Sequence, residues 1–431
     1  MPLRRSRSAA ALAAALLGAA APGPGYAEAQ ARPSAATGPP RENAQREPTL
    51  PRSSATAGVD ADLPELLRRL VGRHEPPSGP GEPAPKRFHL AVLPFVLANP
   101  LLGAGGGLAA VGGFRLGGPE TAFSRFEASI FASTNHQMGF VLRSDVRLPE
   151  NGWILSGDWG GGRFPNPAYG LGGETRTSDR TIVQRQQLQL HETVYRRIWS
   201  GSHLYAGLGW FVDDFYDLVD ERRAAGAATR FSAYSYGTSG RSRSSGTTLN
   251  LLWDGRDSTV APTRGLYALG RFRFEPAELG SDDGWYSTYL DGRAYVAIPG
   301  RRDVLALWGF AWTSSARTPY LLLPQTGTDP EHRSARGMVE GRYAARDLLY
   351  GEVEYRAHLW KALGAVAAVN LTAPSERGVE GSGPSFQTLH PGVAAGLRVL
   401  LDRTSGSNLV LDVGWAPGEG VGFYLNANET F

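Results

Sequence analysis

Residues 407–431 read SNLVLDVGWAPGEGVGFYLNANETF, and the spacing of their apolar residues decides the fold class. Two segments, 407–415 and 421–431, flank a turn that contains Pro and Gly. Apolar and polar residues alternate along both segments, which is the period of a β-strand. In the second segment one face would carry Val421, Phe423, Leu425, Ala427 and Phe431, and the other Tyr424, Asn426, Asn428 and Thr430. The stretch predicts an antiparallel hairpin with one apolar and one polar face.

The same pattern extends upstream as far as Phe88. Segments of roughly ten residues recur between turns of Gly, Pro, Asp, Asn and Ser, which is typical of transmembrane β-barrels. The chain also has 55 Gly and 10% aromatic residues, as suits many short strands. The predicted strands are 88–97, 104–114, 121–134, 137–148, 152–160, 181–196, 203–212, 246–253, 265–275, 285–298, 303–312, 348–358, 362–372, 388–400, 407–415 and 421–431.

The connections between these segments give a second indication. Most alternate connections are short, and the long ones, 161–180, 213–245, 313–347 and 373–387, all fall on the opposite side. A barrel with short periplasmic turns and long external loops has this order, and an even strand count puts both ends in the periplasm. We therefore predict an all-β fold, a sixteen-stranded antiparallel transmembrane β-barrel with apolar residues outside and a polar lumen.

The N-terminal residues predict export. Arg4, Arg5 and Arg7 precede an apolar run over 9–21, and Gly25-Tyr26-Ala27 offers a cleavage site, so residues 1–27 are expected to be a secretory signal peptide. Residues 28–85 form a Pro/Ala-rich stretch that we expect to be a disordered periplasmic linker. A short helix over 60–71 within it could recruit a periplasmic partner. Residues 86–431 would then form the barrel in the outer membrane.

Composition excludes several classes of function. The chain has no Cys, which rules out Cys-based metal sites and thiol catalysis, and its net charge of +3 argues against nucleic-acid binding. No hydrolase, metalloprotease or nucleotide-binding motif occurs, and the eight His residues are scattered. We expect no enzyme activity, no cofactor and no metal. An acidic cluster over 213–221 lacks the EF-hand spacing and is interpreted as a solvated external loop.

An ordered series of motifs over 88–431 resembles the bacterial surface antigen barrels of the BamA/TamA superfamily. The matching stretches are WDGRDSTVAPTRG (253–265), LGSD (279–282), YLDGRAY (289–295), TPY (318–320), ARGM (335–338), GRY (341–343), GEVEYR (351–356) and the final strand. The N-terminal segment is too short and Pro-rich for the periplasmic POTRA domains of that superfamily, so the resemblance implies a POTRA-less member.

The resemblance also implies a loop lock. In the family, an Arg-Gly-aromatic tip of a long external loop folds into the lumen, and its Arg pairs with acidic groups on the wall. The matching residues here are Arg336 and Gly337, with Met338 in place of the aromatic residue. Asn370 stands where the family often has Asp, so we expect Arg336 to pair with Glu354 or Glu352, with Asp412 as a further acidic candidate.

Further charged residues are predicted to line the lumen. They could either bias ion passage or satisfy one another as a plug-like polar interior. These residues are Arg271, Arg273, Asp291, Arg293, Glu352, Glu354 and Arg356.

The last strand resembles the assembly signal of outer-membrane barrels. Its apolar residues Phe423, Leu425 and Phe431 would be captured by the barrel assembly machinery through strand addition, although Glu429 departs from the pattern. Outer-membrane lipid and lipopolysaccharide are the other expected partners. The implied function is moving or inserting macromolecules at the outer membrane through a seam weakened by the Gly-rich stretch 103–113. The alternatives are a passive solute channel and a structural surface antigen without transport.

Overall fold

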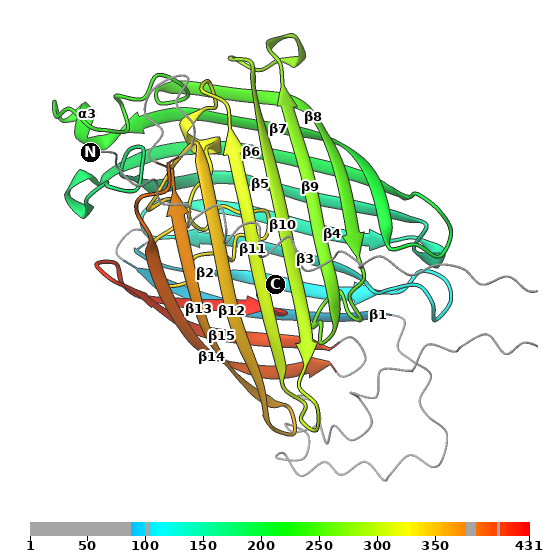
Figure 1. The fold of residues 1–431 in the computed structure, drawn as a ribbon. Helices are drawn as coiled ribbons and strands as arrows, with labels where there is room; N and C mark the ends of the chain where they lie inside the picture. The colour runs from blue at the N-terminus through cyan, green and yellow to red at the C-terminus, as the bar shows by residue number, and fades with distance from the viewer. Residues whose placement is uncertain (1–87, 100–102, 376–384, 403–405) are drawn as a thin grey trace, which may run out of the picture. The chain divides into compact units, whose positions relative to one another are not determined.

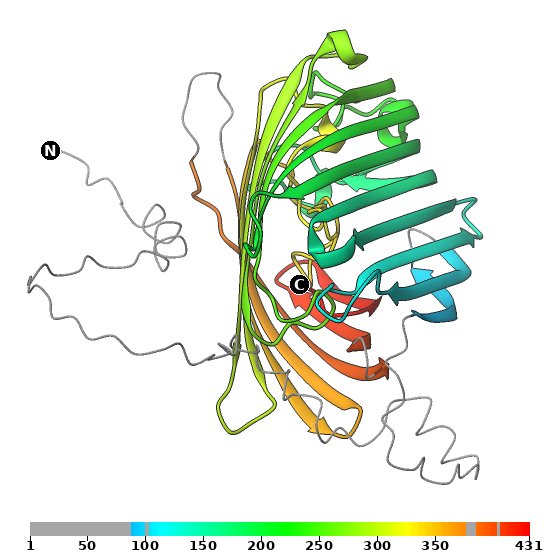
Figure 2. The same ribbon diagram turned by 90° about the vertical axis from the view of Figure 1, so that its right-hand side faces the viewer.

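The computed structural model describes residues 88–99, 103–375, 385–402 and 406–431. These residues form one antiparallel sheet of sixteen strands, in which each strand pairs with its neighbours in the sequence. The sheet curls round an interior (Figures 1 and 2). The predicted number and order of strands are confirmed. The predicted signal peptide, linker and short helix lie outside the described residues and stay predictions.

The strand bounds agree with the sequence pattern except at a few ends. The strands are β1 (Phe88–Asn99), β2 (Gly103–Phe114), β3 (Ser124–Ser133), β4 (Met138–Arg147), β5 (Trp153–Ala168), β6 (Thr181–Arg197), β7 (Leu204–Asp220), β8 (Gly240–Asp254), β9 (Gly265–Glu275), β10 (Trp285–Ala297), β11 (Val304–Ser314), β12 (Asp347–Trp360), β13 (Leu363–Pro374), β14 (His390–Asp402), β15 (Ser407–Ala416) and β16 (Gly420–Ala427).

Three strands extend further than the sequence pattern predicted. β5 continues past 160 to 168, β7 continues past 212 to 220, and β8 begins at 240 instead of 246. The expected loops 161–180 and 213–245 therefore shorten to 169–180 and 221–239. The acidic cluster therefore lies mostly on β7 rather than in a solvated loop, and Asp213 is 1% exposed inside the sheet. Runs of charge concealed the alternation here, because Asp213 faces the interior while Asp214 pairs with the exposed Arg241 at 2.5 Å.

The outer surface of the sheet is apolar. Along β10 the outward residues Tyr286, Leu290 and Val296 are exposed, whereas Asp291 and Arg293 between them are buried inside. Four of the exposed Trp side chains lie near the short turns, as in the aromatic girdle of a membrane barrel. They belong to Trp153, Trp199, Trp253 and Trp360. No helix in the described part of the chain is long and apolar enough to cross a membrane.

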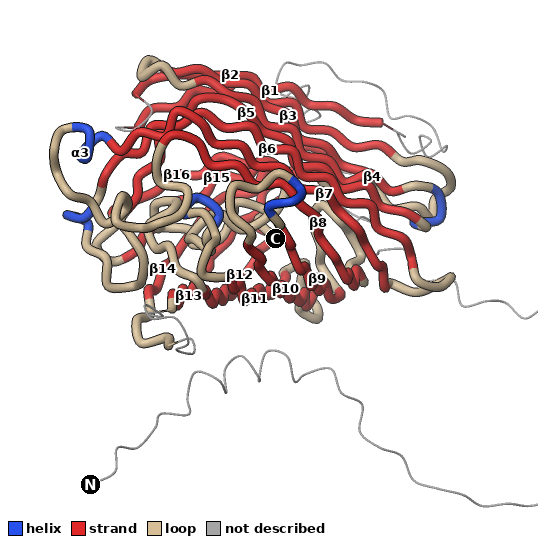
Figure 3. Tube along the Cα trace, turned by 90° about the horizontal axis from the view of Figure 1, so that it is seen from above, coloured by secondary structure: helices blue, strands red, loops and turns tan. Residues whose placement is uncertain are grey.

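The long loops pack against one another at one end of the sheet (Figure 3). Loop 221–239, which begins with α3 (Glu221–Ala224), places Phe231 against Tyr320 with ring centroids 4.8 Å apart. The Tyr320 hydroxyl donates to the Gly170 carbonyl at 3.0 Å and so joins a third loop. Burial raises the pKa of Tyr234 to about 12, so its hydroxyl remains a donor to the Thr318 carbonyl at physiological pH.

Part of the interior is aromatic rather than polar. Trp308 and Phe310 on β11 and Tyr350 on β12 are buried inside the sheet, and the rings of Phe310 and Tyr350 stack 4.9 Å apart. Each such side chain contributes roughly 2–3 kcal/mol on burial. The prediction of a polar lumen is therefore incomplete, because this side of it is packed like a protein core.

Candidate functional site

The connection between β11 and β12, residues 315–346, folds back into the interior of the sheet. Arg336 lies at its tip, with a side chain that is 3% exposed. Its guanidinium contacts Glu352, Glu354 at 2.5 Å and Asp412 at 2.7 Å, on β12 and β15. The structure thus brings Arg336 together with both expected glutamates and with Asp412.

These contacts belong to a larger buried network of charge. Arg398 binds Asp412 at 2.5 Å, and Arg356 binds Glu354 at 2.6 Å. The carboxylates require these cations, because an unpaired buried charge is expensive. A planar guanidinium can bind several oxygens in fixed directions, which suits Arg336 to hold the loop tip against two separate strands.

Gly337 lets the loop tip touch the wall. Its φ of +101° lies in the region that favours glycine, and a Cβ there would come within 2.5 Å of the Trp415 carbonyl carbon. Its N–H donates to the Tyr424 hydroxyl at 2.8 Å. The neighbouring Met338 is 7% exposed and packs into the aromatic core of the lumen.

Asn370 contacts the loop in a way that differs from the family pattern. Its side-chain amide donates to the Arg336 carbonyl oxygen at 3.0 Å, and no bond to the Arg336 guanidinium is found in the described residues. An ionised Asp could not make this contact, because it has no proton to donate. Asn370 therefore holds the backbone of the tip, while the glutamates and Asp412 hold its side chain.

The last residues of the chain also enter the lumen. β16 ends at Ala427, Asn428 adopts a φ of +65°, and the tail 428–431 turns inward, so that the C-terminus lies inside the curve of the sheet (Figures 1 and 2). The Phe431 ring lies 5.1 Å from the Trp308 ring. Phe423 and Leu425 do face outward, at 81% and 54% exposure, but the prediction that Phe431 shares their face is wrong. The turn at Asn428 ends the alternation.

Arg333 connects this tail to the opposite part of the sheet. Its guanidinium donates to the Glu429 carbonyl at 2.5 Å and forms an ion pair with Glu127 on β3 at 3.4 Å. The Glu429 carboxylate is bound in turn by Arg398 at 2.8 Å. The loop thus joins the tail that follows β16 to a side chain on β3, the third strand from the other end of the sheet.

The two edge strands do not pair with each other. β1 bonds only to β2, and β16 only to β15, among the residues that the structure describes. β1 contains Pro94, which lacks an N–H and is confined to edge strands or bulges. β16 is the shortest strand, with 8 residues. The sheet therefore has a seam whose edges are open to a further strand.

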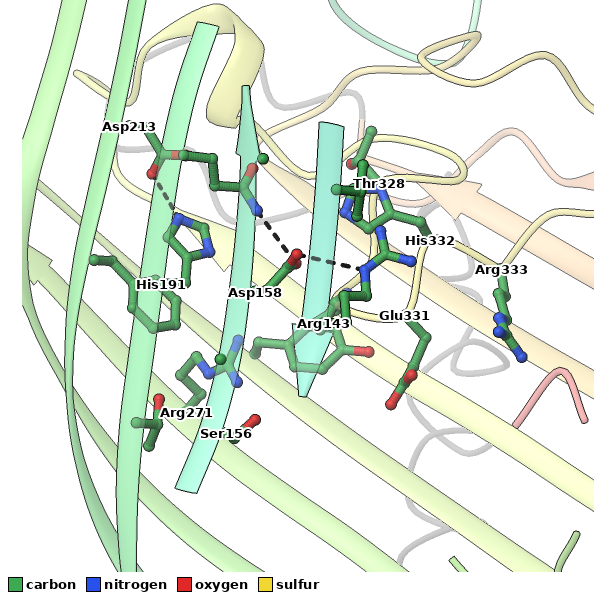
Figure 4. A pocket seen from close by; sticks show the side chains of 18 of the residues that line it. Arg143, Ser156, Asp158, His191, Asp213, Arg271, Thr328, Glu331, His332 and Arg333 are labelled. Atoms are coloured by element: carbon green, nitrogen blue, oxygen red, sulfur yellow. Dashed lines mark hydrogen bonds and ion pairs between the residues drawn. The ribbon is translucent and has the colours of Figure 1, made fainter. Parts of the chain in front are cut away.

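The remaining interior, lined by β3 to β10 and loop 321–340, holds a cavity of about 720 Å³ (Figure 4). Asp158 accepts from Arg143 at 3.4 Å, and His191 contacts Asp213 at 3.0 Å. Sequence reasoning named Arg271, Arg273, Asp291 and Arg293 on this wall but missed these four residues. The alternation along 181–196 would have placed His191 inside. No group of acidic or His residues in the described ranges could hold a metal ion.

The comparisons with known proteins agree with this geometry. The Omp85 superfamily domain matches residues 125–329. CdiB from Escherichia coli is similar in structure, with a TM-score of 0.50 and 12% identity over 79% of this chain and 62% of that chain. BamA from Haemophilus ducreyi lacking POTRA domains 1-3 gives 0.49 and 11% over 79% and 70%.

At these identities the structural likeness concerns the fold alone, and this chain spans less than two thirds of the length of CdiB. A search of curated proteins finds no match. The matched domain, the sixteen-stranded sheet and its apolar outer surface lead to one conclusion. Residues 125–329 of the chain are similar to the Omp85 superfamily domain, and the whole has the architecture of an outer-membrane β-barrel.

Proposed function

We propose that this barrel inserts or moves macromolecules at the outer membrane, and that its seam between β1 and β16 is the route. The unpaired edges of these two strands carry the proposal. An exposed edge presents free N–H and C=O groups, and an incoming strand can pair with them by β-augmentation. A membrane offers no water to satisfy such groups, so an edge that stays unpaired favours a partner strand.

The contacts of Arg336 and Arg333 inside the barrel would hold the seam closed in the resting state. Arg336 fixes the loop tip on β12 and β15, and Arg333 joins the tail after β16 to Glu127 on β3. These contacts connect the two sides of the seam without backbone pairing between them. They can break without unfolding either edge strand, which is what a seam that opens reversibly requires.

Cross-linking across the seam tests the proposal. Because the chain has no Cys, Leu90→Cys and Leu425→Cys place a unique pair on the outward faces of β1 and β16. A short bismaleimide would join them in proteoliposomes. The activity to measure is the rate at which a urea-unfolded β-barrel protein inserts into these liposomes, read from its heat-modifiable gel migration. We expect the cross-link to abolish the acceleration given by the uncross-linked protein.

The control is the pair Leu249→Cys and Phe272→Cys, which are outward-facing partners on the hydrogen-bonded strands β8 and β9. Its cross-link should leave the insertion rate unchanged, since this pair of strands has no reason to separate. Full activity in the seam-linked protein would rule out the lateral route. No acceleration by the unmodified protein would contradict insertion itself.

A further inference from the structure

The lumenal cavity has a surplus of positive charge on its wall. It lies on the β3 to β10 side of the barrel, away from the β12 and β15 carboxylates that hold Arg336. Almost every acidic side chain that lines it already has a cationic partner. These ion pairs are Glu127–Arg333, Asp145–Arg147, Asp158–Arg143, Asp213–Arg273, Asp291–Arg293 and Glu331–Arg125. The exception, Glu340, is exposed to solvent, and it lies near enough to Arg185 for the two charges to interact without forming a direct ion pair.

Two arginines on the wall, Arg185 and Arg271, have no carboxylate partner among the described residues. Both are held in the same manner. Arg185 Nε donates to the Gln187 side-chain oxygen at 2.9 Å, and Arg271 Nε donates to that of Asn250 at 3.0 Å. Their positions are therefore fixed by neutral amides, and neither guanidinium forms a direct ion pair with a carboxylate of the described residues. A guanidinium that is held in place and has no direct carboxylate partner is a suitable site for an anion.

The spacing of these two cations indicates the size of a ligand. The Arg271 guanidinium lies 5.1 Å from the Phe211 ring, and that of Arg185 lies 5.4 Å from the Phe215 ring. Both rings belong to β7 and face the cavity, four residues apart. At ~3.3 Å per residue the Cα atoms of the two Phe residues lie about 13 Å apart along the strand. A disaccharide that carries an anionic group at each end has about this length.

The wall between the two cations is polar but neutral. Gln187 and Gln189 on β6 contribute amides, and Gln189 donates to Asp158, whose charge is neutralised by Arg143. Asp213, which lies between the two Phe residues, is neutralised by Arg273 at 2.5 Å and contacts His191. Amides suit the hydroxyl groups of a sugar, and the cavity volume of about 720 Å³ lies in the range of small-ligand sites.

We propose that the cavity binds a disaccharide-sized sugar with an anionic group, such as phosphate, at each end. Arg185 binds one anionic group, Arg271 binds the other, and the β6 amides contact the sugar between them. The ligand is either a soluble glycan or the headgroup of a glycolipid, since both present this chemistry. The proposal does not depend on whether the β1–β16 seam opens.

Isothermal titration of the full chain in detergent micelles tests this site. The probe is an acyl-free glucosamine disaccharide with a phosphate at each end, and the matched probes are the same disaccharide without phosphate and inorganic phosphate alone. We expect the bisphosphorylated probe to bind at least roughly tenfold tighter than either, because each Arg–phosphate contact contributes the equivalent of about a factor of ten. Binding should weaken as salt is added.

Variants identify the residues. Arg185→Gln and Arg271→Gln should each weaken the bisphosphorylated probe roughly tenfold, and Arg271→Lys should retain part of the affinity. Arg223→Gln, in the exposed loop helix, is the control and should change nothing. Heat-modifiable migration verifies that each variant is a folded barrel. Equal binding of the unphosphorylated sugar, no binding at millimolar probe, or unchanged affinity in both Gln variants would overturn the proposal.

A last titration separates the two sources of the ligand. The acylated form of the bisphosphorylated disaccharide is added in the same micelles. Equal affinity for the acylated and acyl-free forms supports the site and admits a glycolipid headgroup. Binding of the acyl-free form alone supports the site and assigns it to a soluble glycan. Binding of the acylated form alone, with no loss in the Gln variants, would contradict the site.

Discussion

Arg336 is the residue on which the position of the long loop depends. Its one cation lies among Glu352, Glu354 and Asp412, and all three carboxylates are almost fully buried. Removing the cation would leave like charges facing one another, which costs about 3–5 kcal/mol for a buried pair. The loop tip is then the part that can move, because the strands are held by their backbone hydrogen bonds.

The first prediction concerns Arg336→Ala. We expect the loop to leave the lumen, so that the purified protein in a planar bilayer changes from a closed or flickering state to a larger, steady conductance. Arg317→Ala, at an exposed position of the same loop, is the control and should behave as the wild type. A wild-type pore that is already wide and steady, and unaffected by Arg336→Ala, would favour a passive channel.

Asn370→Asp gives a second prediction at the same scale. The new carboxylate would face the Arg336 carbonyl oxygen, to which the amide now donates at 3.0 Å, and would add negative charge beside Glu352. We expect faster proteolysis of loop 315–346 from the long-loop side, by roughly tenfold, since a lost and reversed contact costs on the order of 1–3 kcal/mol. Gln387→Glu, an exposed amide-to-carboxylate change, should leave the cleavage rate unaltered; an unaltered rate in Asn370→Asp would refute this role.

At the scale of elements, the inward tail 428–431 depends on the loop. Arg333 donates to the Glu429 carbonyl and also pairs with Glu127, so the loop holds the tail from one side. Thr430 is 4% exposed in this arrangement. We predict that a Thr430→Cys reporter reacts slowly with a water-soluble maleimide and that Arg333→Ala accelerates the reaction at least several-fold.

The matched control for this labelling experiment is Thr430→Cys combined with Arg317→Ala. It should react as slowly as the reporter alone, because the Arg317 side chain is exposed and is not one of the groups that hold the tail. Equal labelling with and without Arg333 would mean that Phe431 packing against Trp308 holds the tail by itself.

The strands were predictable because each carries its own two-residue period and ends at turn residues. The order of long and short connections was predictable for the same reason. The end of β7 was not predictable, because Asp213, Asp214 and Asp217 interrupt its apolar face. The turn at Asn428 was not predictable either, because the sequence of the tail still alternates where its backbone turns. Arg336 and its carboxylates were found through the resemblance. That Arg185 forms no ion pair among the described residues could not be predicted, because ion pairing across strands depends on register and side-chain direction.

At the scale of the whole barrel, the two sides of the interior differ in packing. On one side, Trp308, Phe310, Tyr350 and the tail fill the lumen, and β12 and β15 are joined through Arg336. On the other side a cavity of about 720 Å³ lies against β3 to β10. We predict that backbone amides of β2 and β3 exchange with deuterium before those of β11 and β12, since local opening follows the density of buried contacts.

Hydrogen-exchange mass spectrometry of the protein in micelles measures this difference directly. Arg336→Ala should reduce the protection of β12 more than that of β2, because the guanidinium of Arg336 binds carboxylates of β12 directly. Uniform exchange over all sixteen strands would mean that backbone pairing alone sets the stability of the barrel.

The inward turn at Asn428 also limits the length of the free edge of β16. β16 offers 8 residues along its free edge, whereas β1 offers 12. At ~3.3 Å per residue these edges are about 26 and 40 Å long, and the shorter length is close to the ~25 Å height of the apolar band of an outer-membrane barrel. A guest strand in the seam could therefore pair with β16 over about the thickness of the apolar band, and with β1 over a longer stretch. The guest strand would separate first from β16, to which it forms fewer backbone hydrogen bonds. The turn at Asn428, which shortens β16, would thus determine which edge releases the guest strand first.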